Sequence, residues 1–453
     1  MRRPTPTALI AGALLVAALA IRLADVEATS YRPINDAGSY LTLASSIAHT
    51  GDYSTSTRPG MGAGGTRGPS AYFPPGFPYF LAAVDLISGN TAPRGGAIHS
   101  GRVSQAVLGT VTVALVGLVA LELFGGTVAL IALTLAAVYP VLVELSAVLV
   151  AENLMTALIL AATLAALRAR RSAHPMRWIA GAGVLTGLAT LTHVNSFLIV
   201  APLAFAAWRV RRGWLAPALT VAAALLTLTP WIVRNAVVMH SFIPVTDESG
   251  ITLVGTYNGA SAANSSVPYK WRIYYGIPGE RRLIRESPHL TEPELSSRLE
   301  SQALHYVGDH PLSPLVVLYH NSLRLLELEG TFAWRASAYA QQIPRGIADA
   351  GVAGFWILGA LAVAGAFTRR IRAAPGWLWA IPLLLWLSVA LVNVETPRFR
   401  EPVDTFLILP AACAIAAAPR ALRRLARAPV GRERGPAVPA GPGQLVEMGE
   451  RLA

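Results

Sequence analysis

Long apolar segments alternate with short polar segments along most of this 453-residue chain. The apolar segments lie near residues 8–23, 98–121, 126–146, 152–168, 177–192, 195–208, 214–233, 350–367, 375–393 and 402–418. Several of them have the roughly 17 to 25 residues that an α-helix needs to cross the hydrocarbon core of a bilayer. The pattern predicts an all-α, polytopic membrane protein.

Two long polar stretches, residues 25–97 and 234–349, interrupt this pattern. Inside the first, residues 73–88 are apolar again. A full crossing there would invert the side of every later basic loop, and prolines break its start, so we expect a re-entrant or surface-lying helix. Inside the second, residues 293–301 predict a short soluble helix. Residues 311–328 have apolar positions at helical spacing, which indicates an amphipathic helix on the bilayer surface.

Clusters of arginine give the expected topology. They lie between apolar segments, at residues 168–171, 209–212, 369–372 and 423–424. Basic loops at alternate helix ends are typical of cytoplasmic loops, so the two long polar stretches are expected outside the cytoplasm. The first apolar segment is either an uncleaved anchor or a cleaved signal peptide, and both place the following loop outside.

This topology divides the chain into four parts. Residues 1–233 form an N-terminal transmembrane module that includes the external loop 25–97. Residues 234–349 form an external region with the amphipathic helix, and residues 350–418 contain the last transmembrane helices. The tail, residues 419–453, is rich in Pro, Gly and Arg, which predicts a disordered cytoplasmic segment.

Composition supports a membrane protein and excludes some partners. Hydrophobic residues make up 53% of the chain and charged residues 14%, and the mean hydropathy is +0.49. Soluble proteins contain about 25% charged residues. The net charge of +12 is explained by the basic loops, so no nucleic-acid partner is expected. Cys413 is the only cysteine, which excludes a disulfide framework and a cysteine-based metal site.

Asp36 is the first candidate for chemistry. It lies about a dozen residues beyond the first apolar segment, before an amphipathic segment that begins near Tyr40. Asn35 or Asp36 fits the N-cap of a helix at this point. A carboxylate at the edge of the membrane is also partly desolvated, which favours a general base. The two roles are compatible.

The glycines of residues 60–65 follow the spacing of a dinucleotide-binding loop. That fingerprint needs a strand before the glycines and a helix after them, and the sequence predicts neither. We therefore expect a flexible loop that can order over a substrate.

Polar residues at the outer ends of the apolar segments are further candidates. Arg234 ends a membrane helix, where a snorkelling arginine is ordinary, and the turn-rich external segment that follows contains Asn258. Such a segment is suited to holding a polar ligand against the bilayer. Glu152 begins an apolar segment and His193 lies in a turn, and ionisable residues at this depth are functional candidates. His193 also fits a core histidine.

Arg398 and Arg400 lie with two glutamates in the short loop 394–401, between the last two spans. Arginine in an external loop runs against the positive-inside tendency. One interpretation is a pair of surface salt bridges. The other is that one guanidinium grips a phosphate, which its planar donor geometry favours.

Several of these motifs, taken in order, resemble the integral-membrane GT-C glycosyltransferases of the protein-O-mannosyltransferase and aminoarabinose-transferase type, the family 39-like enzymes. The motifs are DAGSY at residues 36–40, the Pro74-Pro75 pair, AEN at 151–153, GLATL at 187–191, PWIVRN at 230–235 and RFREP at 398–402. The resemblance therefore covers nearly the whole chain.

The resemblance implies a GT-C-type bundle of about 10–12 transmembrane helices with external juxtamembrane helices. It also implies transfer of a hexosyl or pentosyl group from a polyprenyl-phosphate-linked donor to an envelope lipid, glycan or protein. Asp36 is then the catalytic residue, and Arg398 or Arg400 binds the lipid phosphate. The other residues placed at the substrate are Tyr40, Pro74, Pro75, Glu152, Arg234 and Asn258.

The chain departs from the family pattern at two positions. Ala37 stands where many members have a second acid beside the first, and Phe73 stands where many have a basic residue before the proline pair. No metal or other cofactor is expected, because Asp36 without a neighbouring acid is a weak metal site, and the assistance of a divalent cation stays open.

A transporter or flippase of lipid-linked saccharides is the main alternative. It predicts two halves with related sequences and interrupted helices at the membrane midplane, and the sequence has no internal repeat. A non-catalytic membrane scaffold is the third interpretation. Arginine far outnumbers lysine, since Lys270 is the only lysine, and alanine is abundant. Both features are typical of a GC-rich bacterial genome, so we expect a multi-pass protein of a bacterial inner (plasma) membrane.

Overall fold

The computed structural model describes residues 5–55, 68–90 and 95–427. The chain divides into two compact units, residues 1–416 and 417–453. The first unit contains the membrane helices and the cavity. The glycine-rich loop at residues 60–65 lies outside the described residues, as does the tail beyond Arg427.

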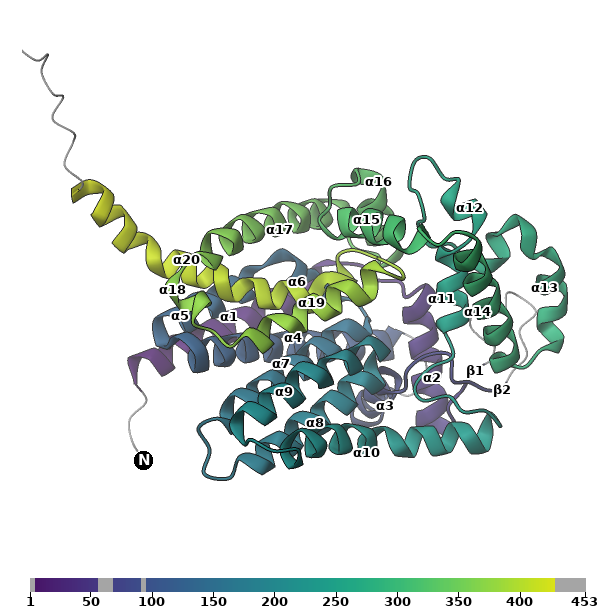
Figure 1. Cartoon of the computed structure of the whole chain (residues 1–453), viewed down its shortest axis with the longest axis horizontal. Coiled ribbons are helices and arrows are strands. Elements are labelled where there is room, and N and C mark those ends of the chain that lie inside the picture. Colours follow the sequence, from purple (N-terminus) through teal and green to yellow (C-terminus); the bar gives the residue numbers. More distant parts are fainter. Residues whose placement is uncertain (1–4, 56–67, 91–94, 428–453) are drawn as a thin grey trace, which may run out of the picture. The chain divides into compact units, whose positions relative to one another are not determined.

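The apolar segments of the N-terminal half form helices that pack side by side (Figure 1). They are α1 (Pro6–Ala28), α4 (Gly95–Phe124), α5 (Gly126–Val138), α6 (Pro140–Glu144), η2 (Leu145–Ala147), α7 (Ala151–Ala169), α8 (Pro175–Thr192), η3 (Val194–Ile199), α9 (Val200–Val210) and α10 (Leu215–Val238). Helix α7 contacts α4 and α8, and α8 contacts α10. Gly125 has a φ of 85° between α4 and α5, a conformation that glycine adopts without strain, and the chain reverses there.

The C-terminal apolar segments form α17 (Arg345–Ala366), α18 (Arg369–Arg372), α19 (Gly376–Ala390) and α20 (Glu401–Arg427), with the short η7 (Arg398–Arg400) before α20. Helix α20 thus continues past residue 418, where the sequence places the end of the last span.

Within the described residues, six helices are long and apolar enough to cross a membrane, and the bent pair of α5 with residues 140–147 makes a seventh if it is one span. Three shorter apolar helices lie at Gly76–Ser88, Val194–Val210 and Gly376–Ala390. The predicted all-α, polytopic membrane fold is confirmed. The segment at 73–88 becomes a 13-residue helix, α3, which is too short to cross alone and agrees with the expected re-entrant or surface-lying helix.

The two polar stretches are largely helical. The first contains α2 (Asn35–Thr50), α3 (Gly76–Ser88) and the two-residue strands β1 (Ser54–Thr55) and β2 (Gly68–Pro69), which pair antiparallel. The second contains α11 (Ser249–Thr256), α12 (Gly259–Ala262), η4 (Tyr274–Gly276), η5 (Pro278–Glu280), α13 (Arg281–Glu286), η6 (Ser287–His289), α14 (Glu292–Asp309), α15 (Ser313–Leu325) and α16 (Thr331–Ala340).

The predicted helices of the second stretch are present with different bounds. The short soluble helix is the 18-residue α14, which begins with a capping box in which Thr291 and Glu294 exchange hydrogen bonds. The predicted amphipathic helix is α15. Leu312, Leu315 and Tyr319 are exposed on one side, and Val317 is buried on the other. An exposed apolar side at helical spacing is typical of a helix that lies on a bilayer.

A shared hydrophobic core joins the two polar stretches. It combines α2 and α3 with α11 and α14, through residues such as Tyr40, Phe77 and Leu299. Helices α11 and α14 approach closely at Gly250, where a Cβ atom would lie 2.0 Å from the backbone oxygen of Ser296. The two polar stretches, residues 25–97 and 234–349, therefore pack together through α2, α3, α11 and α14 as one layer.

Candidate active site

Asp36 lies in the first turn of α2, where the backbone N–H groups favour a carboxylate. Ile34 is the N-cap residue and no side chain caps the helix, so the N-cap interpretation of Asn35 and Asp36 is wrong. The Oδ2 atom of Asp36 instead accepts hydrogen bonds from both terminal nitrogens of Arg398, at 2.9 Å each. Residues 362 positions apart are thus joined by a direct ion pair.

Arg398 holds two further carboxylates. Its Nε donates to Glu152 Oε1 at 2.8 Å, and its Nη1 lies 3.5 Å from Glu395 Oε2. The Arg398 side chain is 7% exposed and that of Glu152 is fully buried in the first turn of α7. One guanidinium therefore fixes carboxylates from α2, from α7 and from the connection between α19 and α20.

A cavity of about 520 Å³ opens beside this cluster. Its charged lining residues are Asp36, Glu248, Lys270, Glu395 and Arg398. Its aromatic lining residues are Tyr72, Phe73, Trp271, Tyr275 and Phe399. A cavity lined by both charged and aromatic residues fits a polar ligand that carries a charge and presents flat or apolar faces.

Burial shifts the titration of the charged residues outside the membrane helices. It raises the pKa of Glu248 to about 8, and the neighbouring charge of Asp36 adds to this effect. Burial also raises the pKa of Glu395, against the opposing influence of Arg398. It lowers the pKa of Lys270, against the opposing influence of Glu395. Perturbed groups gathered in one cavity are typical of functional sites.

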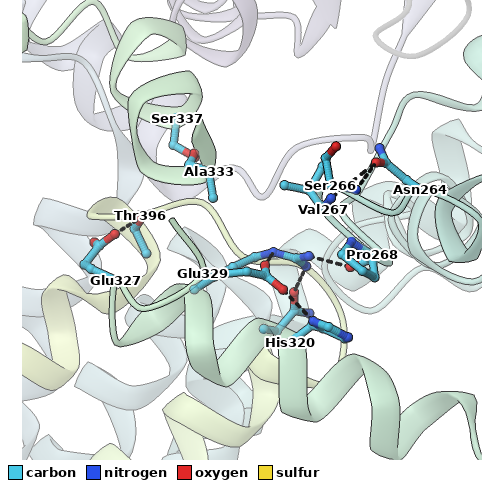
Figure 2. A network of polar contacts seen from close by, with 12 residues as sticks. Asn264, Ser266, Val267, Pro268, His320, Glu327, Glu329, Ala333, Ser337 and Thr396 are labelled. Atoms are coloured by element: carbon cyan, nitrogen blue, oxygen red, sulfur yellow. Dashed lines mark hydrogen bonds and ion pairs between the residues drawn. The ribbon is translucent and has the colours of Figure 1, made fainter. Parts of the chain in front are cut away.

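A network of polar contacts surrounds residues 264–268, the segment that comes just before Lys270 in the chain (Figure 2). Arg324 of α15 donates to the carbonyl of Pro268 and pairs with Glu329, which also contacts His320. Asn264 Oδ1 accepts from the backbone N–H groups of residues 266 and 267, at 3.1 and 3.2 Å. The turn that precedes Lys270 is therefore held from both sides.

Arg400 does not line this cavity. It is fully buried and donates to Asp404 Oδ1 at 3.1 Å, to Glu327 Oε1 at 2.8 Å and to the carbonyl of Leu325 at 2.7 Å. Its guanidinium carbon lies 3.6 Å from the centroid of the Phe355 ring. The structure thus distinguishes the two arginines, because only Arg398 reaches the cavity.

Other residues that the sequence places at the substrate lie in the scaffold around it. Tyr40 is buried against Phe73 and Phe77, with ring centroids 4.8 and 5.1 Å away. Pro75 is the N-cap residue of α3, and the Pro74 carbonyl accepts a 3.4 Å hydrogen bond from a tyrosine hydroxyl.

Arg234 and Asn258 also hold structure together. Arg234 donates to the carbonyls of Ser70 and Tyr53, at 2.8 Å each. Asn258 caps α12 by accepting from the backbone N–H of Ser261, and it lines a second cavity of about 470 Å³ instead of the first. The substrate-binding roles expected for these residues therefore have no direct support from their positions.

The sequence motifs do not identify Glu248, Lys270 or Glu395 as site residues. Glu395 was visible as an acid close to Arg398, and Lys270 as the only lysine. Glu248 lies in the turn-rich external segment that the sequence predicts to hold a polar ligand, but no motif distinguishes it from its neighbours there. Among the described residues, no group of three His, Cys, Asp or Glu side chains is placed to hold a metal ion.

A family model described as dolichyl-phosphate-mannose-protein mannosyltransferase matches residues 73–233. The match includes Glu152 and ends before Arg234, Lys270 and Arg398. No relative among the curated proteins matches the chain.

Solved oligosaccharyltransferase structures share its fold. The oligosaccharyltransferase AglB from Archaeoglobus fulgidus, in complex with an inhibitory peptide and a dolichol-phosphate, has a TM-score of 0.54 at 16% identity, over 92% of this chain and 52% of that chain. The Archaeoglobus fulgidus oligosaccharyltransferase in complex with Zn and sulfate has a TM-score of 0.53 at 16% identity, over 91% of this chain and 50% of that chain. ArnT from Cupriavidus metallidurans, bound to undecaprenyl phosphate, has a TM-score of 0.41 at 14% identity, over 92% and 79%.

The chain thus spans about half the length of the oligosaccharyltransferases that it matches. At these identities the likeness shows the fold. Together with the family match, it confirms the resemblance to integral-membrane GT-C glycosyltransferases that the sequence motifs carry.

Proposed function

We propose that this protein is a glycosyltransferase that moves a sugar from a polyprenyl-phosphate-linked donor to an envelope lipid, glycan or protein, with Asp36 as the base. The observation that carries the proposal is the convergence of Asp36 and Arg398 at one cavity, from opposite ends of the chain. The family match supports the donor class, and AglB and ArnT are solved with polyprenyl phosphates.

The transfer assigned to this cavity is an inverting displacement. The acceptor hydroxyl oxygen bonds to the anomeric carbon of the sugar while its proton passes to the Asp36 carboxylate. The bond between that carbon and the phosphate oxygen breaks, and the electron pair leaves with polyprenyl phosphate. Arg398 acts as a positioning residue, because its two hydrogen bonds orient the Asp36 carboxylate.

Lys270 is the better candidate for the donor phosphate. Arg398 directs all three guanidinium nitrogens at carboxylates, and Arg400 is sealed in the interior. Within the described residues, the Lys270 side chain forms no ion pair or hydrogen bond. An unpaired cation at the cavity wall favours an anion, and the phosphate carries the donor's negative charge. This assignment replaces the phosphate role that the sequence suggests for Arg398 or Arg400.

We place the reaction on the extracytoplasmic side of a bacterial inner membrane. The arginine clusters that flank the membrane segments support this orientation. The exposed apolar side of α15 supports a site at the bilayer surface, since the polyprenyl tail stays in the lipid while the phosphosugar enters the cavity.

Transfer with purified protein tests the proposal. The protein is incubated in detergent with a panel of radiolabelled polyprenyl-phosphate sugars and extracted envelope acceptors, and labelled product is measured. We expect transfer from one donor class, and a loss of about 100- to 10,000-fold in Asp36→Asn. Asp52→Asn, which changes an exposed carboxylate of the same loop, is the matched control and keeps full activity. If the wild-type protein transfers from no donor, or if Asp36→Asn retains activity, the proposal is wrong.

A further inference from the structure

Glu248 is a cavity carboxyl to which the displacement so far assigns no role. It is the residue that precedes α11, and its side chain lines the cavity with Asp36. Within the described residues, its carboxyl forms no ion pair or hydrogen bond. Asp36, by contrast, accepts two hydrogen bonds from Arg398. Of two carboxyls in one cavity, Asp36 is therefore paired with an arginine and Glu248 is not.

The groups around Glu248 favour its neutral form. The titratable and charged groups around it are Asp36 and Tyr40 of α2, Tyr72 before α3, Glu152 of α7, the neighbouring Asp247, Lys270 of the same cavity, and Glu395 and Arg398 between α19 and α20. Burial and the charge of Asp36 raise the pKa of Glu248 to about 8, and Arg398 only partly opposes them. At neutral pH, Glu248 therefore carries a proton.

A neutral carboxyl can stabilise the charge that develops on the departing phosphate. A phosphodiester donor has one negative charge, and breaking the bond to the sugar leaves a phosphate monoester with a second charge. The cavity lining holds three carboxyls, of Asp36, Glu248 and Glu395, beside the cations of Arg398 and Lys270. A neutral carboxyl can give the phosphate oxygen a proton. When two carboxyls of one site have environments that push their pKa values apart, one can act as the acid and the other as the base.

We propose that Glu248 is the general acid that protonates the departing phosphate oxygen while Asp36 takes the proton of the acceptor hydroxyl. This inference rests on the proposed function. The bond from the sugar to the phosphate oxygen breaks, that oxygen takes the electron pair and the Glu248 proton, and the monoester leaves with one charge. Afterwards one proton passes from Asp36 to Glu248 through solvent, which restores both groups.

The pH profile of transfer is the first test. In the wild-type protein, kcat/KM falls as pH rises through about 8, because Glu248 loses its proton. Glu248→Gln retains an N–H donor without a titrating proton, so its plateau is about 10-fold lower and the fall above pH 8 is lost. Glu248→Ala has neither a hydrogen-bond donor nor a titrating proton at this position, so its kcat/KM is about 100-fold lower. Glu280→Gln changes a partly buried glutamate that does not line this cavity and leaves the profile unchanged.

Binding of polyprenyl monophosphate is a second test that does not need transfer. Affinity is measured between pH 7 and 9.5, where we expect about a 10-fold loss in the wild-type protein and little change in Glu248→Gln. Lys270 faces the same space and also titrates at high pH. A fall that persists in Glu248→Gln and disappears in Lys270→Arg would assign the effect to the lysine and overturn the proposal.

The outcomes separate the two claims. If the wild-type protein transfers sugar and Glu248→Gln keeps its full activity and the same fall above pH 8, the general-acid role is wrong and the proposed function stands. If no donor is used, the proposed function fails, and the pH dependence of phosphate binding still decides whether Glu248 gives a proton to the phosphate. Thermal unfolding of each variant shows whether a loss of activity reflects misfolding.

Discussion

Arg398 and Arg400 are two residues apart, and they do different work. Both belong to η7, a 3₁₀ turn with about three residues per turn, so side chains two apart point to different sides. Arg398 faces a cavity and holds Asp36, whose side chain is 38% exposed. Arg400 faces the interior and holds Asp404 and Glu327, which are almost fully buried. The ion pair of Arg398 thus forms part of the cavity, whereas the ion pairs of Arg400 form part of the buried interior.

The two arginines show that an exposed carboxylate, more than the presence of an arginine, distinguishes the candidate active site from a structural ion pair. A sealed ion pair can only stabilise or destabilise the fold. An ion pair with one open carboxylate leaves lone pairs for a substrate. Substitutions at the two arginines therefore separate into effects on stability and effects on transfer.

Arg400→Met should cause the largest effect. It leaves the Asp404 and Glu327 carboxylates buried without their cation, which destabilises a protein by about 3–5 kcal/mol. Chemical or thermal unfolding in detergent measures this loss. Arg298→Met breaks an exposed pair with Glu286 and is the matched control, with a loss below about 1 kcal/mol. Equal losses in the two variants would contradict the structural role of Arg400.

Arg398→Lys should mainly reduce transfer. Lysine keeps the charge and loses the planar fork that binds Asp36 and Glu152 together. We expect about a 100-fold fall in kcat for misaligned catalytic geometry and a smaller loss of stability than in Arg400→Met. If Arg398→Lys unfolds as readily as Arg400→Met while its folded fraction stays fully active, the assignment of Arg398 to transfer and Arg400 to stability is wrong.

Lys270→Gln should raise the KM for the lipid donor by about 10-fold, since one charge-assisted hydrogen bond contributes about 1.5–3 kcal/mol. We expect kcat to change much less, because the cation binds the donor before and during transfer. Lys270→Arg should restore most of the affinity. Steady-state kinetics with varied donor concentration measure both constants, and an unchanged KM in Lys270→Gln would exclude the phosphate assignment.

Asp247 and Glu292 form a buried pair of acids in the external layer. Burial and the adjacent Glu292 raise the pKa of Asp247 to about 9. Glu292 in turn accepts from Ser70 Oγ and from the backbone N–H of Ala71. Because the folded state keeps a proton that the unfolded chain loses above pH 4, the stability from this group declines as pH rises towards 9.

Thermal unfolding at several pH values tests this pair. The unfolding temperature of the wild-type protein should fall by roughly one or two degrees per pH unit between pH 6 and 8. Asp247→Asn keeps a hydrogen-bond donor and removes the titrating proton, so its profile should be flatter. Parallel profiles for the two proteins would show that Asp247 does not titrate as described.

The sequence predicts the membrane fold well because lipid requires long apolar helices, and that requirement is visible in every span. It also identifies Asp36, Glu152 and Arg398, which the structure brings together. It does not separate Arg398 from Arg400, since the direction of a side chain depends on the local 3₁₀ turn.

The external loops are harder to predict. Arg234 and Asn258 look like ligand-binding residues in the sequence, and the structure uses them to hold loop carbonyls and to cap a short helix. Lys270 and Glu248 carry no motif, and they reach the cavity through packing of α11 and the turn at residues 264–268. Such positions depend on contacts between distant segments, which hydropathy does not encode.

The ion pair between Asp36 and Arg398 also constrains how the protein is made. A ribosome adding about 5–20 residues per second takes roughly 20–70 s to synthesise the 362 residues that separate the two partners. Throughout that interval, the nascent chain carries the Asp36 carboxyl without Arg398, and Glu152 is without it for the last 246 residues. The pocket therefore matures only after the final hairpin enters the bilayer, and a truncated or prematurely released product has no means of completing it.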